Sequence, residues 1–227
     1  MTQTVWAAVD DYLEDLYVHS DPVLDKAIQT SAEAGLPGIQ VTPSQGMLLH
    51  ILACMQKAGK ILEIGTLGGY STIWLARALP EDGRMLSLEA EPSHAVVARA
   101  NLETAGLSGK VEVRLGRALD TLPRVAARGE GPFDLIFIDA DKMSIAEYFS
   151  WALRLSRPGS LIIVDNVVRN GAVIDAQSAD PAVQGVRRFN ELAAAQRGVL
   201  ITTLQTVGRK GYDGFTLVYV LGDTPAA

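Results

Sequence analysis

The sequence predicts an open α/β sheet of seven strands, mostly parallel, with helices on both faces and an antiparallel last strand. Two observations lead to this fold class. From residue 60 onward, short apolar runs typical of buried strands alternate with longer segments of helical periodicity. Such alternation is typical of a parallel sheet covered by helices. The last two apolar runs are joined by only six residues, 208–213, which is too short for a parallel crossover.

Length and composition favour one domain. The chain has 227 residues, 48% of them hydrophobic, which is enough for one well-buried core. We predict a single domain with an N-terminal helical cap over residues 1–40, an α/β core over 41–222 and a short tail over 223–227.

Charge and cysteine content limit the classes of function. The formal net charge of −6 argues against nonspecific binding to nucleic acid, which needs a basic face. Cys54 is the only cysteine, so no intrachain disulfide can form, and a reducing compartment fits. The sequence has neither the pattern of a signal peptide nor an apolar stretch of the roughly 18 residues that a membrane span needs. We therefore expect a cytoplasmic protein that acts on a small molecule, without nucleic acid or membrane as partners.

The N-terminal part of the chain is predicted to be helical. Apolar residues recur at three- and four-residue steps over about 4–34, which predicts a helical segment that ends before Pro37. The next helix begins after Thr42, because Thr42 precedes Pro43 and lies three residues before Gln45. This is the pattern of a capping box with proline at the first helical position.

The rest of the chain supplies the alternating elements of the sheet. Strands are predicted at 60–65, 83–90, 111–116, 133–139, 160–166, 199–207 and 214–221. Helices are predicted at 70–79, 92–106, 118–128, 144–156 and 183–196. Ligands of such sheets bind beyond the carboxyl ends of the strands. Three of these ends carry acids: Glu63, Glu89 and Asp139.

A glycine-rich turn follows the first strand of the sheet. Its glycines, at 65, 68 and 69, allow a tight turn, but they do not have the G-x-G-x-x-G spacing of dinucleotide binders. A tight turn without a ligand therefore remains an alternative. Glu89 closes the second strand, where an acid can accept hydrogen bonds from the hydroxyls of a ribose. Glu91 is the competing candidate, although its place before Pro92 favours a role in capping the next helix.

Several motifs resemble those of a known family. ILEIGTLGGYSTIWLARAL and LSLEA resemble motif I and the following acidic motif of class I S-adenosylmethionine (SAM)-dependent methyltransferases. FDLIFIDADK and LIIVDNVVRNGAV resemble the cation-dependent O-methyltransferases related to the caffeoyl-coenzyme A and catechol enzymes. The resemblance runs from about residue 38 to the C-terminus. It implies a Rossmann-like sheet, SAM as methyl donor, S-adenosylhomocysteine (SAH) as product, a divalent cation and a homodimer.

Oxygen-bearing side chains end two strands that we expect to be neighbours. Asp139 ends one strand, and Asp165 and Asn166 end the next along the chain. Two carboxylates and an amide carbonyl make an oxygen-only site, which suits Mg²⁺, or Mn²⁺ or Ca²⁺, better than zinc. The alternative is that Asp139 and Asp141 are solvated loop acids.

The resemblance also implies roles for individual residues. The residues that match Asp139, Asp165 and Asn166 hold the metal, and those that match Lys142 and Asp139 lie in the catalytic centre. The donor would be contacted by Val41, Glu63, Gly65, Thr66, Gly69, Ser71, Glu89, Ala118, Asp139 and Asp141. Asn170 matches a position near the substrate, and Tyr212 could reach the mouth of the site.

These roles give a hypothesis for the reaction and its substrate. Two vicinal oxygens of the acceptor would bind the cation, Lys142 would accept or steer the hydroxyl proton, and the resulting phenolate would attack the methyl group in line. Lys26 is the only basic residue before residue 57, so the N-terminus has no basic cluster for the phosphates of coenzyme A. We therefore expect a free catechol, another small phenol or a small natural product as acceptor.

Two other functions are compatible with parts of the pattern. The strand–glycine turn–strand–acid order also occurs in nicotinamide-dependent oxidoreductases, although that function explains neither Asp165 with Asn166 nor Lys142. A non-catalytic SAM-binding protein is the second alternative, against which the complete metal set argues. His50 and His94 have no partner at metal-ligand spacing, and we expect both to be structural or surface residues.

Overall fold

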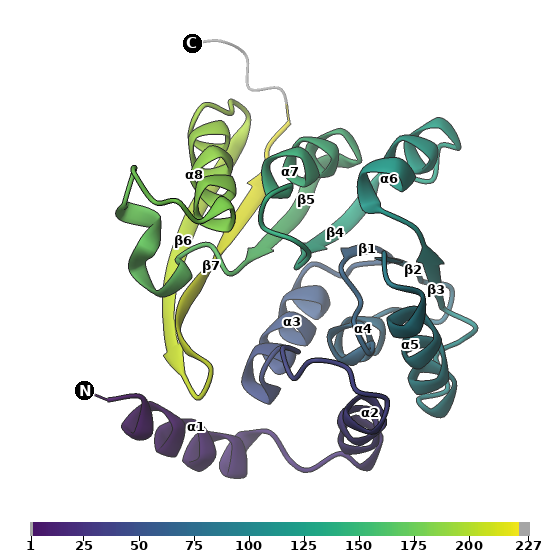
Figure 1. Ribbon diagram of the computed structural model, residues 1–227. Coiled ribbons are helices and arrows are strands. Elements are labelled where there is room, and N and C mark those ends of the chain that lie inside the picture. Colours follow the sequence, from purple (N-terminus) through teal and green to yellow (C-terminus); the bar gives the residue numbers. More distant parts are fainter. Residues whose placement is uncertain (1, 223–227) are drawn as a thin grey trace.

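The computed structural model describes residues 2–222 and contains a seven-stranded sheet (Figure 1). The predicted tail, 223–227, lies outside the described residues. The strands are β1 (Lys60–Ile64), β2 (Arg84–Glu89), β3 (Val111–Leu115), β4 (Phe133–Ile138), β5 (Ser156–Asp165), β6 (Val199–Gly208) and β7 (Gly211–Val220). Their order in the sheet is β3-β2-β1-β4-β5-β7-β6. The predicted fold class is confirmed.

The antiparallel part of the sheet lies at the C-terminal end of the chain. β7 runs antiparallel to both of its neighbours, β5 and β6, and the remaining pairs are parallel. β6 and β7 are joined by a turn of only Arg209 and Lys210, since Gly208 pairs with Gly211. The predicted connection of six residues, 208–213, is therefore too long. Its glycine and polar residues are typical of loops, but four of the six belong to β6 or β7.

The helices are α1 (Gln3–Tyr17), α2 (Pro22–Glu33), α3 (Pro43–Met55), α4 (Tyr70–Ala76), α5 (Pro92–Thr104), α6 (Ala118–Ala127), α7 (Ile145–Arg154) and α8 (Pro181–Ala194), with a 3₁₀ segment, η1 (Arg169–Ile174). The segment predicted to be helical over about 4–34 contains two helices, α1 and α2, separated by a short break. Asp21 caps a new helix by accepting hydrogen bonds from the backbone N–H groups of Val23 and Leu24. No helix within residues 2–222 is long and apolar enough to cross a membrane.

Helices cover both faces of the sheet (Figure 1). Alternate strand residues point to opposite faces. Ile61 therefore belongs to a hydrophobic cluster that includes residues of α3, α4 and α5, whereas its neighbour Leu62 belongs to a second cluster that includes residues of α6, α7 and α8. Because both faces are buried, the central strands are mainly apolar, and polar residues within them, such as Glu63 and Ser87, are buried and hydrogen-bonded to each other.

The order in which the chain adds strands to the sheet reverses between β1 and β4, which are parallel neighbours. From β1 the chain proceeds outward to β2 and β3, and then returns to β4 on the other side of β1. The loops that follow β1 and β4 touch closely: the Asp139 N–H donates to the Ile64 carbonyl at 2.9 Å. A Cβ atom on Gly65, whose φ is 101°, would lie 2.2 Å from the Asp139 carbonyl oxygen. Only glycine therefore fits at this crossing.

The N-terminal helix α1 lies beside the β6–β7 turn, beneath it in Figure 1. Arg209 of the turn forms ion pairs with Asp11 and Glu14 of α1. Glu14 also accepts hydrogen bonds from the backbone N–H and the hydroxyl of Ser44, at the start of α3, both at 3.2 Å. Helix α1 thus connects the β6–β7 turn to the beginning of α3.

Close packing of α8 against the loop after β4 gives a test of the fold. A Cβ atom on the buried Gly185 would lie 2.0 Å from the carbonyl oxygen of Lys142. We expect Gly185→Ala to lower the free energy of unfolding by about 1–3 kcal/mol, since the backbone must move to admit a methyl group. Urea denaturation measures the loss. Gly109→Ala is the matched control, because no atom lies within 4 Å of its Cβ position. Equal stability of the two variants would contradict this packing.

Candidate active site

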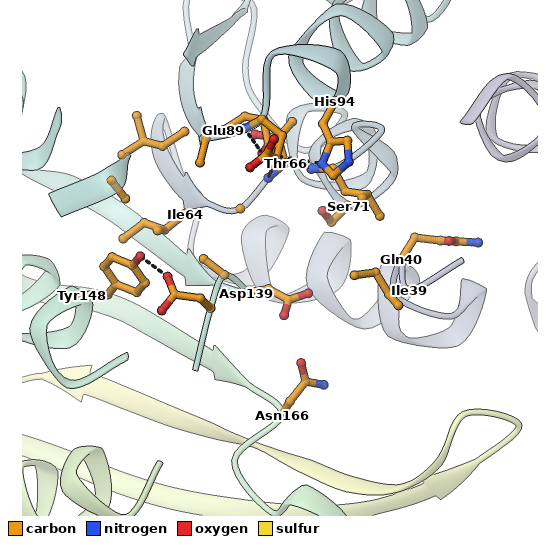
Figure 2. A pocket seen from close by; sticks show the side chains of 18 of the residues that line it. Ile39, Gln40, Ile64, Thr66, Ser71, Glu89, His94, Asp139, Tyr148 and Asn166 are labelled. Atoms are coloured by element: carbon orange, nitrogen blue, oxygen red, sulfur yellow. Dashed lines mark hydrogen bonds and ion pairs between the residues drawn. The ribbon is translucent and has the colours of Figure 1, made fainter. Parts of the chain in front are cut away.

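A cavity of ≈ 490 Å³ lies at the carboxyl ends of the parallel strands, beside the boundary between β1 and β4 where the strand order reverses (Figure 2). This is the size of a small-ligand site. Most of the residues that the sequence predicted to bind a donor line this cavity: Val41, Gly65, Thr66, Ser71, Glu89, Ala118, Asp139 and Asp141. These residues are far apart in the sequence. They meet at the cavity because the parallel sheet brings the carboxyl ends of β1, β2 and β4 to one edge.

Glu63 lies beneath the glycine-rich turn, outside the cavity wall. Its side chain is completely buried and accepts hydrogen bonds from the hydroxyls of Ser71 (2.6 Å), Thr72 (2.5 Å) and Ser87 (2.5 Å). Burial raises the pKa of Glu63 to about 7, although the three hydroxyls oppose the shift. The carboxyl group therefore fixes the first turn of α4 to β2. Gly69, with a φ of 82°, starts α4 and is likewise absent from the residues that line the cavity.

Glu89 holds the glycine-rich turn from the opposite side. One carboxylate oxygen accepts hydrogen bonds from the backbone N–H groups of Thr66 (3.2 Å) and Leu67 (2.8 Å), and the other accepts from Glu91 N–H (2.9 Å). Part of its acceptor capacity remains for a ligand hydroxyl. Glu91 occupies the N-cap position of α5, but its side chain makes no capping hydrogen bond. Both Glu89 and Glu91 line the cavity, so the choice of Glu89 as the ribose-binding acid stays a prediction.

His94 and Tyr148 line this cavity although the sequence did not predict either of them as a site residue. The His94 Nδ1 atom lies 3.7 Å from a carboxylate oxygen of Glu89, and its ring lines the cavity beside Thr66 (Figure 2). On the other side, Tyr148 donates its hydroxyl to Asp141, and both residues line the cavity. Burial and the hydrogen bond to Asp141 raise the pKa of the Tyr148 hydroxyl, so it stays a donor. A histidine and a tyrosine in ordinary helices carry no sequence signal for these positions.

The predicted acidic cluster is formed by β4 and β5, which are neighbours in the sheet. The Lys142 Nζ atom lies 2.8 Å from an Asp139 carboxylate oxygen. Asp165 is 4% exposed, and it accepts hydrogen bonds from Asn166 N–H (2.8 Å) and, at 3.3 Å, from the side-chain amide of Gln45. Burial, and then the negative charge of Asp139, raise the pKa of Asp165 to about 7. A nearby positive charge would stabilise both carboxylates.

The donor chemistry of this cluster fits a hard cation. Within residues 2–222, no group of three His, Cys, Asp or Glu side chains could hold a metal ion. A cation site at Asp139 and Asp165 would therefore depend on the amide oxygen of Asn166 as a third side-chain ligand. Asn166 follows Asp165 directly, and its positive φ of 58° turns the chain sharply at the strand end. Two carboxylates and an amide oxygen suit Mg²⁺, Mn²⁺ or Ca²⁺. This set of oxygens is compatible with the predicted metal ligands, whose role stays a prediction.

A second cavity of ≈ 550 Å³ adjoins the first and contains Asp165 in its wall. The two cavities share a wall formed by Ile39, Gln40, Val41, Asn166 and Arg169. Neither Asn170 nor Tyr212, which we expected near the substrate, is among the residues that line either cavity. Asn170 is exposed, and the Tyr212 hydroxyl bonds to Gln205. Their predicted contact with a substrate therefore stays a prediction, whereas Arg169 and Lys210 do line the second cavity.

Comparison with known proteins identifies the family. A family model described as O-methyltransferase matches residues 14–220. The chain belongs to the SAM-dependent O-methyltransferase family. This membership replaces the alternative of a nicotinamide-dependent oxidoreductase. It also explains the combination of a glycine-rich turn, an acid at the end of β2 and a wide cavity between them, without a G-x-G-x-x-G motif.

Similar proteins cover nearly the whole of this O-methyltransferase. A catechol O-methyltransferase from Niastella koreensis is 53% identical over 97% of this chain and 100% of its own, and one from Mycobacterium tuberculosis is 49% identical over 93% and 94%. The structure of an O-methyltransferase from Bacillus cereus in complex with SAH has a TM-score of 0.95 and 54% identity, covering 96% of this chain and 100% of its own. That of TomG from Streptomyces achromogenes, in complex with SAM, has a TM-score of 0.94 and 53% identity, covering 98% and 100%.

The buried carboxyl group of Glu63 predicts a pH dependence of stability. Between the usual pKa of 4.5 and about 7, the unfolded chain loses this proton while the folded protein keeps it. The Glu63 contribution to stability is therefore full below pH 4.5 and is lost as pH rises to 7. Glu63→Gln should remove this loss, so its free energy of unfolding relative to wild type should increase between pH 5 and pH 8. Urea titrations at both pH values test this, with Glu103→Gln as the exposed control. A pH-independent difference between wild type and Glu63→Gln would contradict the shifted pKa.

Proposed function

We propose that this O-methyltransferase transfers the methyl group of SAM to a hydroxyl of a catechol-like acceptor, with the help of a divalent cation. The single observation that carries the proposal is that Asp139, Lys142 and Asn166 line the first cavity, while Asn166 and its neighbour Asp165 line the adjoining one. The names of the relatives from Niastella koreensis and Mycobacterium tuberculosis support the catechol. The neighbours in complex with SAH and SAM support the donor.

The first cavity is the proposed donor site. Glu89 would accept a hydrogen bond from the donor ribose, in the role that an acid at the end of the second strand takes in related sheets. The amino terminus of α4 and the glycine-rich turn would face the donor carboxylate with their partial positive charge, beside the Ser71 hydroxyl. Because Ser71 donates its own proton to Glu63, its oxygen is left to accept from the donor ammonium or from water.

Asp139, Asp165 and Asn166 are the proposed ligands of the cation. When bound, the cation would supply the positive charge that lowers the pKa of the acceptor hydroxyl and keeps Asp165 ionised despite its burial. The oxygen-only ligand set favours Mg²⁺, with Mn²⁺ and Ca²⁺ as the other candidates.

The protein's own residues would position the reactants and move the proton. Lys142 is held beside Asp139, with only 9% of its side chain exposed, so its Nζ atom is directed into the site and away from bulk water. We propose that Lys142 accepts or steers the proton of the acceptor hydroxyl. The oxygen then attacks the methyl group in line, so that a C–O bond forms while the bond from the methyl carbon to the sulfonium sulfur breaks and SAH leaves. Asp141, held by the Tyr148 hydroxyl, would keep the donor in place. Holding the two reacting atoms in contact supplies much of the rate.

A methyl-transfer assay tests the proposal directly. Labelled SAM is incubated with catechol and with phenols that have a single hydroxyl, with and without Mg²⁺. We expect transfer to catechol that requires the divalent ion, and weaker transfer to single phenols, which offer one oxygen instead of two. Full activity in the presence of a chelator would overturn the role of the cation, and transfer to none of these acceptors would overturn the choice of substrate.

Loss of one proposed ligand gives a sharper test of the cation site. Asp165→Ala should lower cation-dependent turnover at least about 100-fold. Loss of a residue that only supports a metal ligand costs about 10–100-fold, and Asp165 is a proposed direct ligand. Titration of the protein with Mn²⁺, followed by electron paramagnetic resonance, should show weaker binding, whereas calorimetry should show unchanged affinity for SAH. Asp82→Ala, at an exposed turn, is the matched control. Normal Mn²⁺ binding by Asp165→Ala would contradict the proposed ligand set.

The assembly is the last part of the proposal, and we propose a homodimer. Apolar side chains are exposed on α1, at Val5, Val9 and Leu16, and on the edge strand β6, at Leu200 and Leu204. An exposed edge strand with apolar residues favours contact with another chain. Light scattering during gel filtration should give twice the mass of one chain. Leu204→Lys should shift the mass toward that of the monomer. If the variant has the same mass as the wild type, this face is not the dimer interface.

A further inference from the structure

Arg169 has an unusual backbone conformation at the junction of the two cavities. Its φ is 54°, and the next two residues, Asn170 and Gly171, also have positive φ values. An arginine in this left-handed region is strained, unlike a glycine. The conformation is held by Asp213, one carboxylate oxygen of which accepts hydrogen bonds from the N–H groups of Val168 (2.9 Å) and Arg169 (3.0 Å). The start of β7 therefore fixes the direction in which the Arg169 side chain leaves the backbone.

The guanidinium group of Arg169 has donors to spare. Its side chain is only 33% exposed and lines both cavities. Its Nε atom is buried and has no hydrogen-bond partner within residues 2–222. Its contact with Asp213 is loose, at 3.9 Å from Nη1, and the same carboxylate already serves backbone N–H groups. A buried donor without a partner is costly in the free protein, so it points to a ligand that supplies the acceptor.

Lys210 adds a second positive charge to the second cavity from a different element. It belongs to the turn between β6 and β7 and lines the second cavity but not the first. Partial burial lowers the pKa of Lys210, while the nearby carboxylates of Asp139 and Asp165 raise it. The position of the turn is fixed by its neighbour Arg209, which is paired with α1. Lys210 is therefore presented to the cavity by a braced turn.

The acids in the same wall are largely committed to other partners. Asp10 accepts a hydrogen bond from Arg209 N–H at 2.7 Å, and Asp213 binds the backbone around Arg169. Asp165 belongs to the proposed cation site. Arg169 and Lys210 are thus the positively charged side chains of the second cavity that can donate to an anionic group of a ligand. Arginine pairs well with carboxylates because its donors form a planar fork.

We propose that Arg169 and Lys210 bind a carboxylate on the methyl acceptor, so that the preferred substrate is a catechol that carries a carboxylate group. This inference rests on the proposed function of the second cavity as the acceptor site. The carboxylate of SAM is the other source of the same chemistry, because Arg169 also lines the donor cavity. Lys210 distinguishes the two, since it lines only the acceptor side.

The test compares 3,4-dihydroxybenzoate with its methyl ester, which has the same catechol ring and no charge. We expect the wild-type enzyme to have a kcat/KM for the acid at least about tenfold above that for the ester, with most of the difference in KM, as a charge-assisted hydrogen bond would give. Arg169→Gln and Lys210→Gln should each remove most of this preference and leave turnover of the ester within about threefold of wild type. Lys210→Glu should disfavour the acid further and favour a catechol with an amino group.

Matched controls and a second measurement separate this inference from its alternatives. Arg128→Gln and Lys26→Gln remove charges outside both cavities and should leave the preference unchanged. Calorimetry with SAH should give the same affinity for wild type, Arg169→Gln and Lys210→Gln. Weaker SAH binding with an intact acid preference would overturn the inference and assign Arg169 to the donor. Equal losses for acid and ester would overturn it in favour of a structural role. Transfer to no catechol at all, with SAH binding retained, would overturn the proposed function itself.

Discussion

The site depends on the close contact between the loops that follow β1 and β4. The N–H of Asp139 donates to the carbonyl of Ile64, and the backbone at Gly65 passes so near the Asp139 carbonyl that a side chain would not fit. This contact places the glycine-rich turn, which belongs to the proposed donor site, against the loop that carries Asp139, Asp141 and Lys142. A shift of one loop would therefore move the donor relative to the proposed cation site. The parallel pairing of β1 with β4 provides the rigid base for this contact.

Two buried carboxyl groups near this contact have different environments and different consequences. Glu63 is surrounded by three hydroxyl donors, so its hydrogen bonds are satisfied inside the protein, and it supports the turn from below. Asp165 has only one backbone N–H and a long contact from Gln45, and it lies near a second carboxylate. Both pKa values are raised to about 7 by burial. The two groups differ in their hydrogen-bond donors, because Asp165 has fewer donors than Glu63 and also borders a cavity.

The sequence was sufficient for the parts of the site that follow from topology. Parallel strands have their carboxyl ends at one edge, so the neighbourhood of Asp139 and Asp165 could be predicted without side-chain coordinates. The position of Glu63 could not, because residues of a strand point alternately to both faces and the pattern does not show which hydroxyls cover an acid. Arg169 escaped prediction for another reason: its left-handed backbone is imposed by Asp213, 44 residues later in the chain. Long-range hydrogen bonds of this kind have no local signature.

Gln45 shows how the N-terminal helices enter the chemistry of the site. Its side-chain oxygen accepts a hydrogen bond from Thr42 N–H in the capping box, and its amide group donates to Asp165. The same turn of α3 is bound through Ser44 to Glu14, and Glu14 is paired with Arg209 beside Lys210. Helix α1 therefore braces two sides of the proposed acceptor cavity: the start of α3, which touches the buried Asp165, and the β6–β7 turn, which carries Lys210. Displacement of α1 would disturb both, so this helix acts as part of the cavity wall although it lies outside the sheet.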